Sequence, residues 1–299
     1  MAAARISKNN NAPQVTRPRQ FLRVLLDRIQ LLAWLVGNRP PVIPGFVVIQ
    51  DMFIRQRTSI KTYTRLRIYK NHKTNTAIYL QYAPACPWLA PAKLTIIPDD
   101  CSGICRRELE TIARAFKNIR LLTVEMAFDF SDSSGIDRAF VLRHGLFGKS
   151  QLVEGRHFDD LRHGTRHSAT MVREYNKREI GCYRVEIELH SAWLRRFEIE
   201  TPADLARLPN LLCFKRIKFV EIDWDALSDY FYNKGRSSSA LKHPRLQTHS
   251  IQQALRALRH GTGLVNVQRF LRPLPLNVAV KEELRRWSAR WEGVSKESF

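Results

Sequence analysis

The sequence predicts an α+β fold, built from a mixed, mainly antiparallel sheet with packed helices and a helical C-terminal part. Three observations support this prediction. The composition is globular, since 44% of the 299 residues are hydrophobic and 26% are charged. Segments of alternating polarity follow one another across short turns, as in antiparallel sheets. Strands and helices do not alternate regularly along the chain, which argues against a parallel α/β sheet.

The expected strands are alternating or β-branched runs that end near Pro, Gly or Asn. They cover residues 42–56, 63–70, 76–83, 92–98, 121–130, 169–177, 182–190 and 211–224. The first is centred on Val47–Ile49 and is expected to be buried. The NHKTN sequence after residue 70 predicts a hairpin, and Gly181 predicts a turn before the strand that follows it.

Helices are expected where apolar residues recur every three or four positions. The segment 106–119 shows this spacing, and 201–210 begins with a Thr-Pro capping pair. From Asp225 onward the pattern is mostly helical. We therefore expect a body over residues 42–232, followed by a helical, basic C-terminal region over 233–299.

The N-terminal residues are expected to form an arm and a helix. Residues 1–18 contain basic residues but no acid, which is typical of a disordered basic arm. Residues 19–41 are expected to form an amphipathic helix that docks on the body and ends at the GNRPP sequence. The apolar stretch from Ile29 to Gly37 is much shorter than the ~20 residues that span a bilayer, so no membrane partner is expected.

The charge and the cysteines limit the class of protein. The formal net charge of +21 disfavours a compact chain unless a polyanion is nearby, so nucleic acid is the first candidate partner. An anionic membrane surface and a well-solvated basic surface are the alternatives. The five cysteines show no disulfide-like framework, which indicates a reducing, cytoplasmic location. Cys101 and Cys105 lack a second pair at zinc-finger spacing, so structural zinc is not expected.

The TVEMAFDF sequence (123–130) separates an apolar face from an acidic one. In a strand, Glu125 and Asp129 lie opposite the apolar side chains. A solvated strand face and a divalent-metal site both fit this pattern. Because four residues of strand span ~13 Å, the two carboxylates are not expected to ligate one ion together. One of them would bind the metal, with further ligands from other strands.

The YRVEIELH sequence (183–190) alternates in the same way. Arg184, Glu186, Glu188 and His190 share its polar face. If this strand pairs near 121–130, Glu186 lies across from the acidic face. A polar surface strand without a function explains the pattern equally well.

Tyr175 lies in a markedly basic segment. Its basic neighbours are Arg166, Arg173, Lys177 and Arg178. They favour a phosphate near the tyrosine, whose phenol can act as a nucleophile once its proton is removed and the phosphate charge is neutralised. Asn176 offers an uncharged oxygen ligand for Mg²⁺ or Mn²⁺, and Lys177 offers a cation near the phenolate or the phosphate. An ordinary packing tyrosine in a strand is the alternative interpretation.

Four segments occur in a characteristic order: TVEMAFDF (123–130), GTRHS (164–168), YNK (175–177) and YRVEIELH (183–190). Together they resemble the replication initiation factor family of rolling-circle plasmids and related mobile elements. The resemblance covers the chain from about 120 to 190 and is weaker over 42–100. It implies that Tyr175 nicks one DNA strand at an origin, joins to the 5′ phosphate and leaves a 3′ hydroxyl that primes synthesis.

The resemblance also assigns the other site residues. It implies that Glu125 and Asn176 ligate Mg²⁺ or Mn²⁺, with Asp51 as a looser match to the family's first acid. Asp129 stays a candidate ligand on the strand pattern alone. Glu125 stands where the family often has Asp. The arginines expected to bind DNA are Arg166, Arg173, Arg178 and Arg184. The sequence has no His-apolar-His metal motif, so it does not resemble the two-histidine class of nickases. His163 and His167, which flank the GTR sequence, are weaker candidates for metal ligands.

Three functions remain open from the sequence. The first is a rolling-circle initiator whose body, 42–232, is a nicking domain for origin DNA in double-stranded and locally single-stranded form. The second is a nickase, or relaxase, for conjugative or transposon transfer. The third is a basic DNA-binding protein without catalysis. A host helicase and a second copy of the chain, as a homodimer, are further candidate partners.

Overall fold

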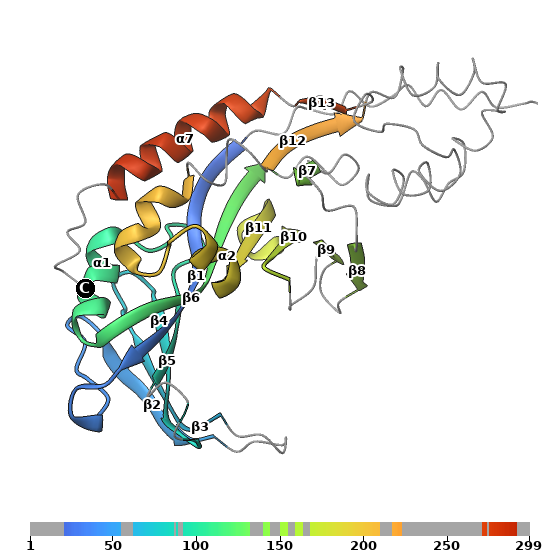
Figure 1. Ribbon diagram of the computed structural model, residues 1–299. Coiled ribbons are helices and arrows are strands. Elements are labelled where there is room, and N and C mark those ends of the chain that lie inside the picture. Colours follow the sequence, from blue (N-terminus) through green and yellow to red (C-terminus); the bar gives the residue numbers. More distant parts are fainter. Residues whose placement is uncertain are drawn as a thin grey trace, which may run out of the picture.

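The computed structural model describes residues 21–54, 62–86, 88, 92–131, 140–143, 150–154, 159–163, 168–209, 217–222, 271–273 and 275–291. These residues form a ten-stranded sheet with helices packed on one of its faces, and a three-stranded sheet beside it (Figure 1). Every strand pair in the described ranges is antiparallel. This architecture confirms the α+β prediction.

The main sheet has the strand order β2-β3-β4-β5-β1-β6-β11-β10-β9-β8. Its strands are β1 (Phe21–Trp34), β2 (Val47–Phe53), β3 (Tyr63–Lys70), β4 (Ala77–Pro84), β5 (Ala92–Ile97), β6 (Lys117–Ser131), β8 (Ser150–Glu154), β9 (Asp159–His163), β10 (Thr170–Lys177) and β11 (Cys182–His190). The small sheet contains β7 (Phe140–Arg143), β12 (Ile217–Ile222) and β13 (Leu271–Pro273). The helices are α1 (Arg106–Arg114), α2 (Ser191–Arg196) and α7 (Leu276–Trp291), with short 3₁₀ segments η1 (Val36–Asn38), η2 (Arg178–Ile180) and η3 (Pro202–Arg207).

The predicted helix over 19–41 is wrong, because this segment forms the long central strand β1. The strand lies between β5 and β6, and Val24, Leu25 and Leu26 are buried in succession. A strand buried on both faces has a continuous apolar run, which periodicity alone does not distinguish from a buried helix. The segment therefore belongs to the same sheet as the body and is not a separate N-terminal element.

The core lies on one face of the main sheet. Val124, Met126 and Phe128 of β6 belong to one apolar cluster with buried side chains of α1, α2 and α7. Burying a large apolar side chain contributes ~1.5–3 kcal/mol, so this face stabilises the fold. The apolar face predicted for 121–130 is thus confirmed. Helix α1 is also confirmed, although it ends before Lys117, where β6 begins.

The two predicted hairpins are confirmed, and one expected burial is not. Strand β3 pairs with β4 across the NHKTN turn, and β10 pairs with β11 across η2. Gly181 has a φ of 61°, a conformation that glycine adopts without steric cost. Strand β2 forms around Val47–Ile49, but it is exposed rather than buried, because it is the edge of the sheet.

A bulge in β1 determines where Asp27 lies. Leu26 pairs with Met126, and Arg28 pairs with the adjacent residue of β6, Glu125. Asp27 is therefore an extra residue in the ladder, and a bulge re-aims the side chain at this point. As a result, Asp27 joins Arg28 on the polar face of the sheet.

The C-terminal prediction is confirmed in part. Helix α7 is formed, whereas residues 223–270 and the basic arm, 1–18, lie outside the described residues. Among the helices that the structure describes, none is both long and apolar enough to cross a membrane.

Candidate active site

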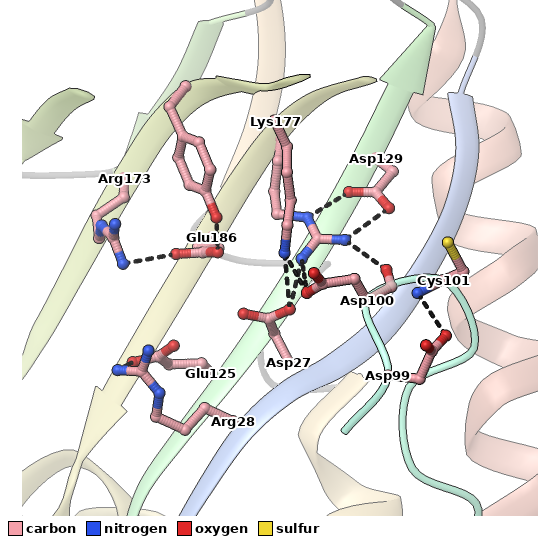
Figure 2. Close-up of polar contacts among 12 residues, drawn as sticks. Asp27, Arg28, Asp99, Asp100, Cys101, Glu125, Asp129, Arg173, Lys177 and Glu186 are labelled. Carbon is pink, nitrogen blue, oxygen red and sulfur yellow. Dashed lines mark hydrogen bonds and ion pairs between the residues drawn. The ribbon is translucent and has the colours of Figure 1, made fainter. Parts of the chain in front are cut away.

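The polar face of the sheet carries a cluster of charged side chains from β1, β6, β11 and β10 (Figure 2). Arg184 of β11 pairs with Asp129 of β6 and with Tyr175 of β10. Two residues along β11, Glu186 pairs with Arg173 of β10. Because alternate residues of a strand point to the same side, all these side chains share the face opposite the core.

Three carboxylates converge at the centre of this cluster. Asp27, Glu125 and Glu186, here called the acidic triad, each have a carboxylate oxygen within 4.8 Å of the others. Only 1% of Glu125 and 2% of Glu186 is exposed. Oε2 of Glu125 accepts no hydrogen bond from the described residues, and Oε2 of Glu186 lies 3.0 Å from Nη1 of Arg173 in an ion pair without hydrogen-bond geometry. Burying a carboxylate oxygen without a hydrogen-bond donor is costly. A hard divalent cation, which prefers oxygen ligands, fits this donor set.

Burial disfavours the charged forms of two carboxylates of the triad, Glu125 and Glu186. Burial raises the pKa of Glu125 to about 8, although Arg28, at 3.1 Å, opposes the change, and the charge of Glu186 adds to it. Burial also raises the pKa of Glu186 to about 7, with the charge of Asp27 adding to the effect and Arg173 opposing it. These acids therefore hold protons near neutral pH. A bound divalent cation would reverse this balance, because it favours the ionised carboxylates.

Tyr175 lies directly beside the triad. Its hydroxyl donates a hydrogen bond to Oε1 of Glu186, and only 9% of the residue is exposed. The guanidinium of Arg173 lies 5.2 Å from the centre of the tyrosine ring, and its Nη1 atom lies 3.0 Å from Oε2 of Glu186 as an ion pair. Burial, followed by the charge of Glu186 and the hydrogen bond to it, raises the pKa of Tyr175. The phenol therefore needs a proton acceptor and added positive charge before it can act as a nucleophile.

Arg184 holds the cluster together. Its fully buried side chain donates hydrogen bonds of 2.6 and 2.9 Å to Asp129, and it also binds Asp27 and the backbone oxygen of Asp100. Asp129 accepts a further bond of 2.8 Å from Arg23. Burial alone would raise the pKa of Asp129, but the two arginines outweigh burial and lower it. Arg184 and Asp129 thus fix Asp27 in the triad.

The structure brings several predicted site residues together (Figure 2). Those in or beside the triad are Glu125, Arg173, Tyr175 and Lys177. Lys177 contacts Asp100, and its Nζ lies 3.9 Å from Asp27. Of the two acids on β6, only Glu125 belongs to the triad, because arginines hold Asp129. This separation agrees with the strand spacing. Both acids are buried, so the solvated face considered for them is not formed.

Two predicted metal ligands do not join the site. Asn176 follows Tyr175 on β10, so alternation places it toward the opposite face of the sheet. Asp51 lies on the edge strand β2, where Arg67 and Tyr82 bind its carboxylate. Neither side chain therefore lies with the three carboxylates of the triad.

The predicted DNA-binding arginines differ in their surroundings. Arg184 is fully buried in ion pairs, so it does not face a phosphate. Arg173 lies in the site, and Arg178 is exposed on η2. His163 lies on β9 opposite Val172. Two further predicted residues lie outside the described ranges, namely Arg166 and His167.

Sequence reasoning does not identify Asp27 as a site residue, because it assigns the surrounding segment to a helix. The signal that identifies it is a carboxylate inside an apolar run, since a charge buried in such a strand requires partners. Glu186 appears in the sequence only as a residue that would lie across from the acidic face. The pairing of β11 with β6 meets that condition, because Glu186 is opposite Ala127.

Comparisons with known proteins are sparse. No family model matches the chain, and no curated protein matches it. A solved structure of a rolling circle replication initiator protein from Geobacillus stearothermophilus aligns with a TM-score of 0.39 and 14% sequence identity. The alignment covers 67% of this chain and 87% of that one.

Proposed function

We propose that the chain nicks DNA in a divalent-metal-dependent reaction, as a rolling-circle replication initiator, with Tyr175 as the nucleophile. The observation that carries this proposal is the hydrogen bond from the buried hydroxyl of Tyr175 to Glu186, a member of the acidic triad. A phenol, a proton acceptor and a set of metal-binding carboxylates are therefore adjacent. Phosphodiester transfer to a tyrosine uses all three.

In the proposed reaction, the oxygen of Tyr175 attacks the phosphorus of one DNA strand. The phenol proton passes to Glu186, a bond forms between the tyrosine oxygen and phosphorus, and the bond from phosphorus to the 3′ oxygen breaks. The products are a 5′-phosphotyrosine and a 3′ hydroxyl, which takes up a proton and can prime synthesis. Mg²⁺ or Mn²⁺ held by the triad would polarise the phosphate. Arg173 and Lys177 add positive charge beside the phenol.

Charge and motif order support DNA as the substrate. The net charge of +21 favours a polyanion as partner. The ordered segments from 123–130 to 183–190 resemble those of rolling-circle initiators, which act at origins. We therefore propose origin DNA, double-stranded and locally single-stranded, as the substrate. A nickase for conjugative or transposon transfer would use the same chemistry.

One observation favours a second candidate, a basic DNA-binding protein without catalysis. Tyr175 is almost completely buried, and its surroundings raise its pKa. In the absence of a cation the phenol is therefore held in its unreactive form. The two candidates differ in whether adding a divalent metal and DNA produces strand transfer.

The proposal is tested with supercoiled DNA that carries the origin of the element encoding the chain, in the presence of Mg²⁺ or Mn²⁺. We expect nicked circles and a covalent protein–DNA adduct. Both should be lost in Tyr175→Phe and retained in Tyr69→Phe, which changes a core tyrosine of β3 whose hydroxyl donates a hydrogen bond to the backbone oxygen of Pro41. If the wild-type protein binds this DNA without nicking it, and Tyr175→Phe binds equally well, the non-catalytic function stands instead.

A further inference from the structure

The polar face of the sheet continues from the site over β1, β5, β4 and β3, and no helix that the structure describes covers it. Those helices pack on the opposite face, where Leu109 of α1, Leu194 of α2 and Leu284 of α7 belong to the core (Figure 1). Side chains on the uncovered face are half-exposed along all four strands.

Five side chains on this face, here called the sheet platform, form two adjoining rows: Gln30, Tyr79, Gln81, Lys93 and Thr95. In the first row, Tyr79 pairs with Thr95, and Thr95 pairs with Gln30. In the second row, Gln81 pairs with Lys93. Since residues that pair across antiparallel strands point to the same side, each row is a continuous strip of surface.

The sheet platform adjoins the acidic triad. Gln30 is two residues from Arg28 on β1, so both side chains lie on the same face. Arg28 in turn forms an ion pair of 3.1 Å with Glu125 of the triad. Three strand spacings separate β6 from β4, or roughly 14 Å. That is the length of about four nucleotides at ~3.4 Å each.

Most of the platform's polar side chains have no partner in the part of the chain that the structure describes. Gln30, Gln81, Lys93 and Thr95 form no side-chain hydrogen bond or ion pair with any residue in the described ranges. Strands β3, β4 and β5 contain no acidic residue. Burial lowers the pKa of Lys93. A half-buried cation without a carboxylate beside it would be stabilised by an anion from outside the chain.

We propose that the sheet platform binds single-stranded DNA next to the scissile phosphate, with Tyr79 stacking on a base and Lys93 contacting a backbone phosphate. This inference rests on the proposed nicking function. Surfaces that bind single strands combine aromatic side chains with cations and with groups that hydrogen-bond to the strand. The base faces are hidden in a duplex, so a half-exposed tyrosine on an open sheet fits a single strand better.

The test measures the binding of a fluorescent oligo-dT of about twelve nucleotides, a length within the usual range for surfaces that bind single strands. The buffer contains EDTA, which removes divalent metal ions and so prevents nicking. We expect Tyr79→Leu and Lys93→Gln to weaken binding, Tyr79→Leu by about five- to a hundredfold. Tyr79→Phe and Lys93→Arg keep the stacking face and the charge and should bind like wild type. Arg114→Gln removes an exposed cation from α1, on the covered side, and should also leave binding unchanged.

Photo-cross-linking of an oligonucleotide that contains 5-iododeoxyuridine locates the strand on the wild-type protein, whether or not a variant folds. We expect adducts on the peptide 77–84, which contains Tyr79. The inference is overturned if Tyr79→Leu and Lys93→Gln are folded and bind like wild type, or if the adducts lie only outside β1, β3, β4 and β5. A preference for oligo-U over oligo-dT would overturn the assignment to DNA.

The two proposals can fail separately. If the strand lies on the sheet platform but origin DNA is never nicked, the nicking function fails and the binding surface stands. If nicking occurs but the platform variants bind and cross-link like wild type, only the inference about the platform fails.

Discussion

Glu125 makes the stability of the metal-free protein depend on pH. Its pKa of about 8 in the folded protein lies above its ordinary value of 4.5. Between these two values the folded chain retains a proton that the unfolded chain has released, so stability falls as the pH rises. The loss approaches ~1.4 kcal/mol per pH unit for one proton. We expect urea unfolding in EDTA to give a lower free energy of unfolding at about pH 8 than at about pH 6.

The matched variant Glu125→Gln removes the titrating group and keeps its shape. It should reduce this pH dependence to the part that comes from Glu186, whose pKa is also raised, and Mg²⁺ or Mn²⁺ should stabilise it less than wild type near pH 8. The control Glu282→Gln changes an exposed carboxylate on α7 and should leave the pH dependence as it is. Equal slopes in wild type and Glu125→Gln would contradict the assignment of the raised pKa to this carboxyl.

The loss of Arg184 should strongly destabilise the protein, because its side chain is fully buried in ion pairs. Arg184→Met would leave the carboxylates of Asp129 and Asp27 without their main buried partner. Removing one partner of a buried ion pair typically costs about 3–5 kcal/mol. Arg178→Met, at an exposed position of η2, should stay within about 0.5 kcal/mol of wild type in the same urea titration. A loss below about 1 kcal/mol for Arg184→Met would show that the cluster does not depend on this arginine.

Among the elements, β1 and β2 should differ strongly in how much stability a substitution costs. Leu26 is buried at the centre of the sheet, whereas Val48 lies half-exposed on the edge strand. Leu26→Ala should cost about 2–5 kcal/mol because it leaves a cavity, while Val48→Ala should cost about 0.5 kcal/mol or less. Chemical denaturation measures both. Similar losses at the two positions would contradict the central place of β1.

The elements differ in how far sequence alone predicts them. Strands β6 and β11 each have one apolar face and one polar face, so alternation identifies them and their core-facing residues. Strand β1 is buried on both faces near Leu25, so apolar and polar residues do not alternate there and the pattern does not identify a strand. The edge position of β2 depends on which strands pair, and pairing is a property of the whole sheet.

The same limit applies to the candidate site. Tyr175, Lys177 and Glu125 stand in recognisable motifs, so their chemistry can be anticipated from the sequence. Asp27 enters through a bulge, which depends on the local pairing of β1 with β6. Asn176 is next to Tyr175 in the sequence, but successive residues of β10 point to opposite faces of the sheet. Asn176 therefore lies away from the face that carries the triad.

For the whole molecule, the net charge of +21 should dominate the affinity for nucleic acid. Each phosphate contact releases counterions, so binding of duplex or single-stranded DNA should weaken steeply between about 50 and 200 mM salt. Lys93→Gln should reduce the slope of log K against log salt for a single strand by about one. Fluorescence anisotropy at several salt concentrations measures this slope. A flat salt dependence would exclude an electrostatic interface.

One sheet supplies both the stabilising core and the face that carries the candidate site. The bulge at residue 27 adds a carboxylate to the site without changing the pairing of the core residues beside it. Without Asp27, Leu26 and Arg28 would be adjacent in β1 and still opposite Met126 and Glu125, which are adjacent in β6. A deletion of one codon would thus remove this bulge and leave the apolar pairing of Leu26 with Met126 in place. A relative of this chain could thus lose the acidic triad and keep the sheet. Inserting one acidic residue at the same position would restore the triad.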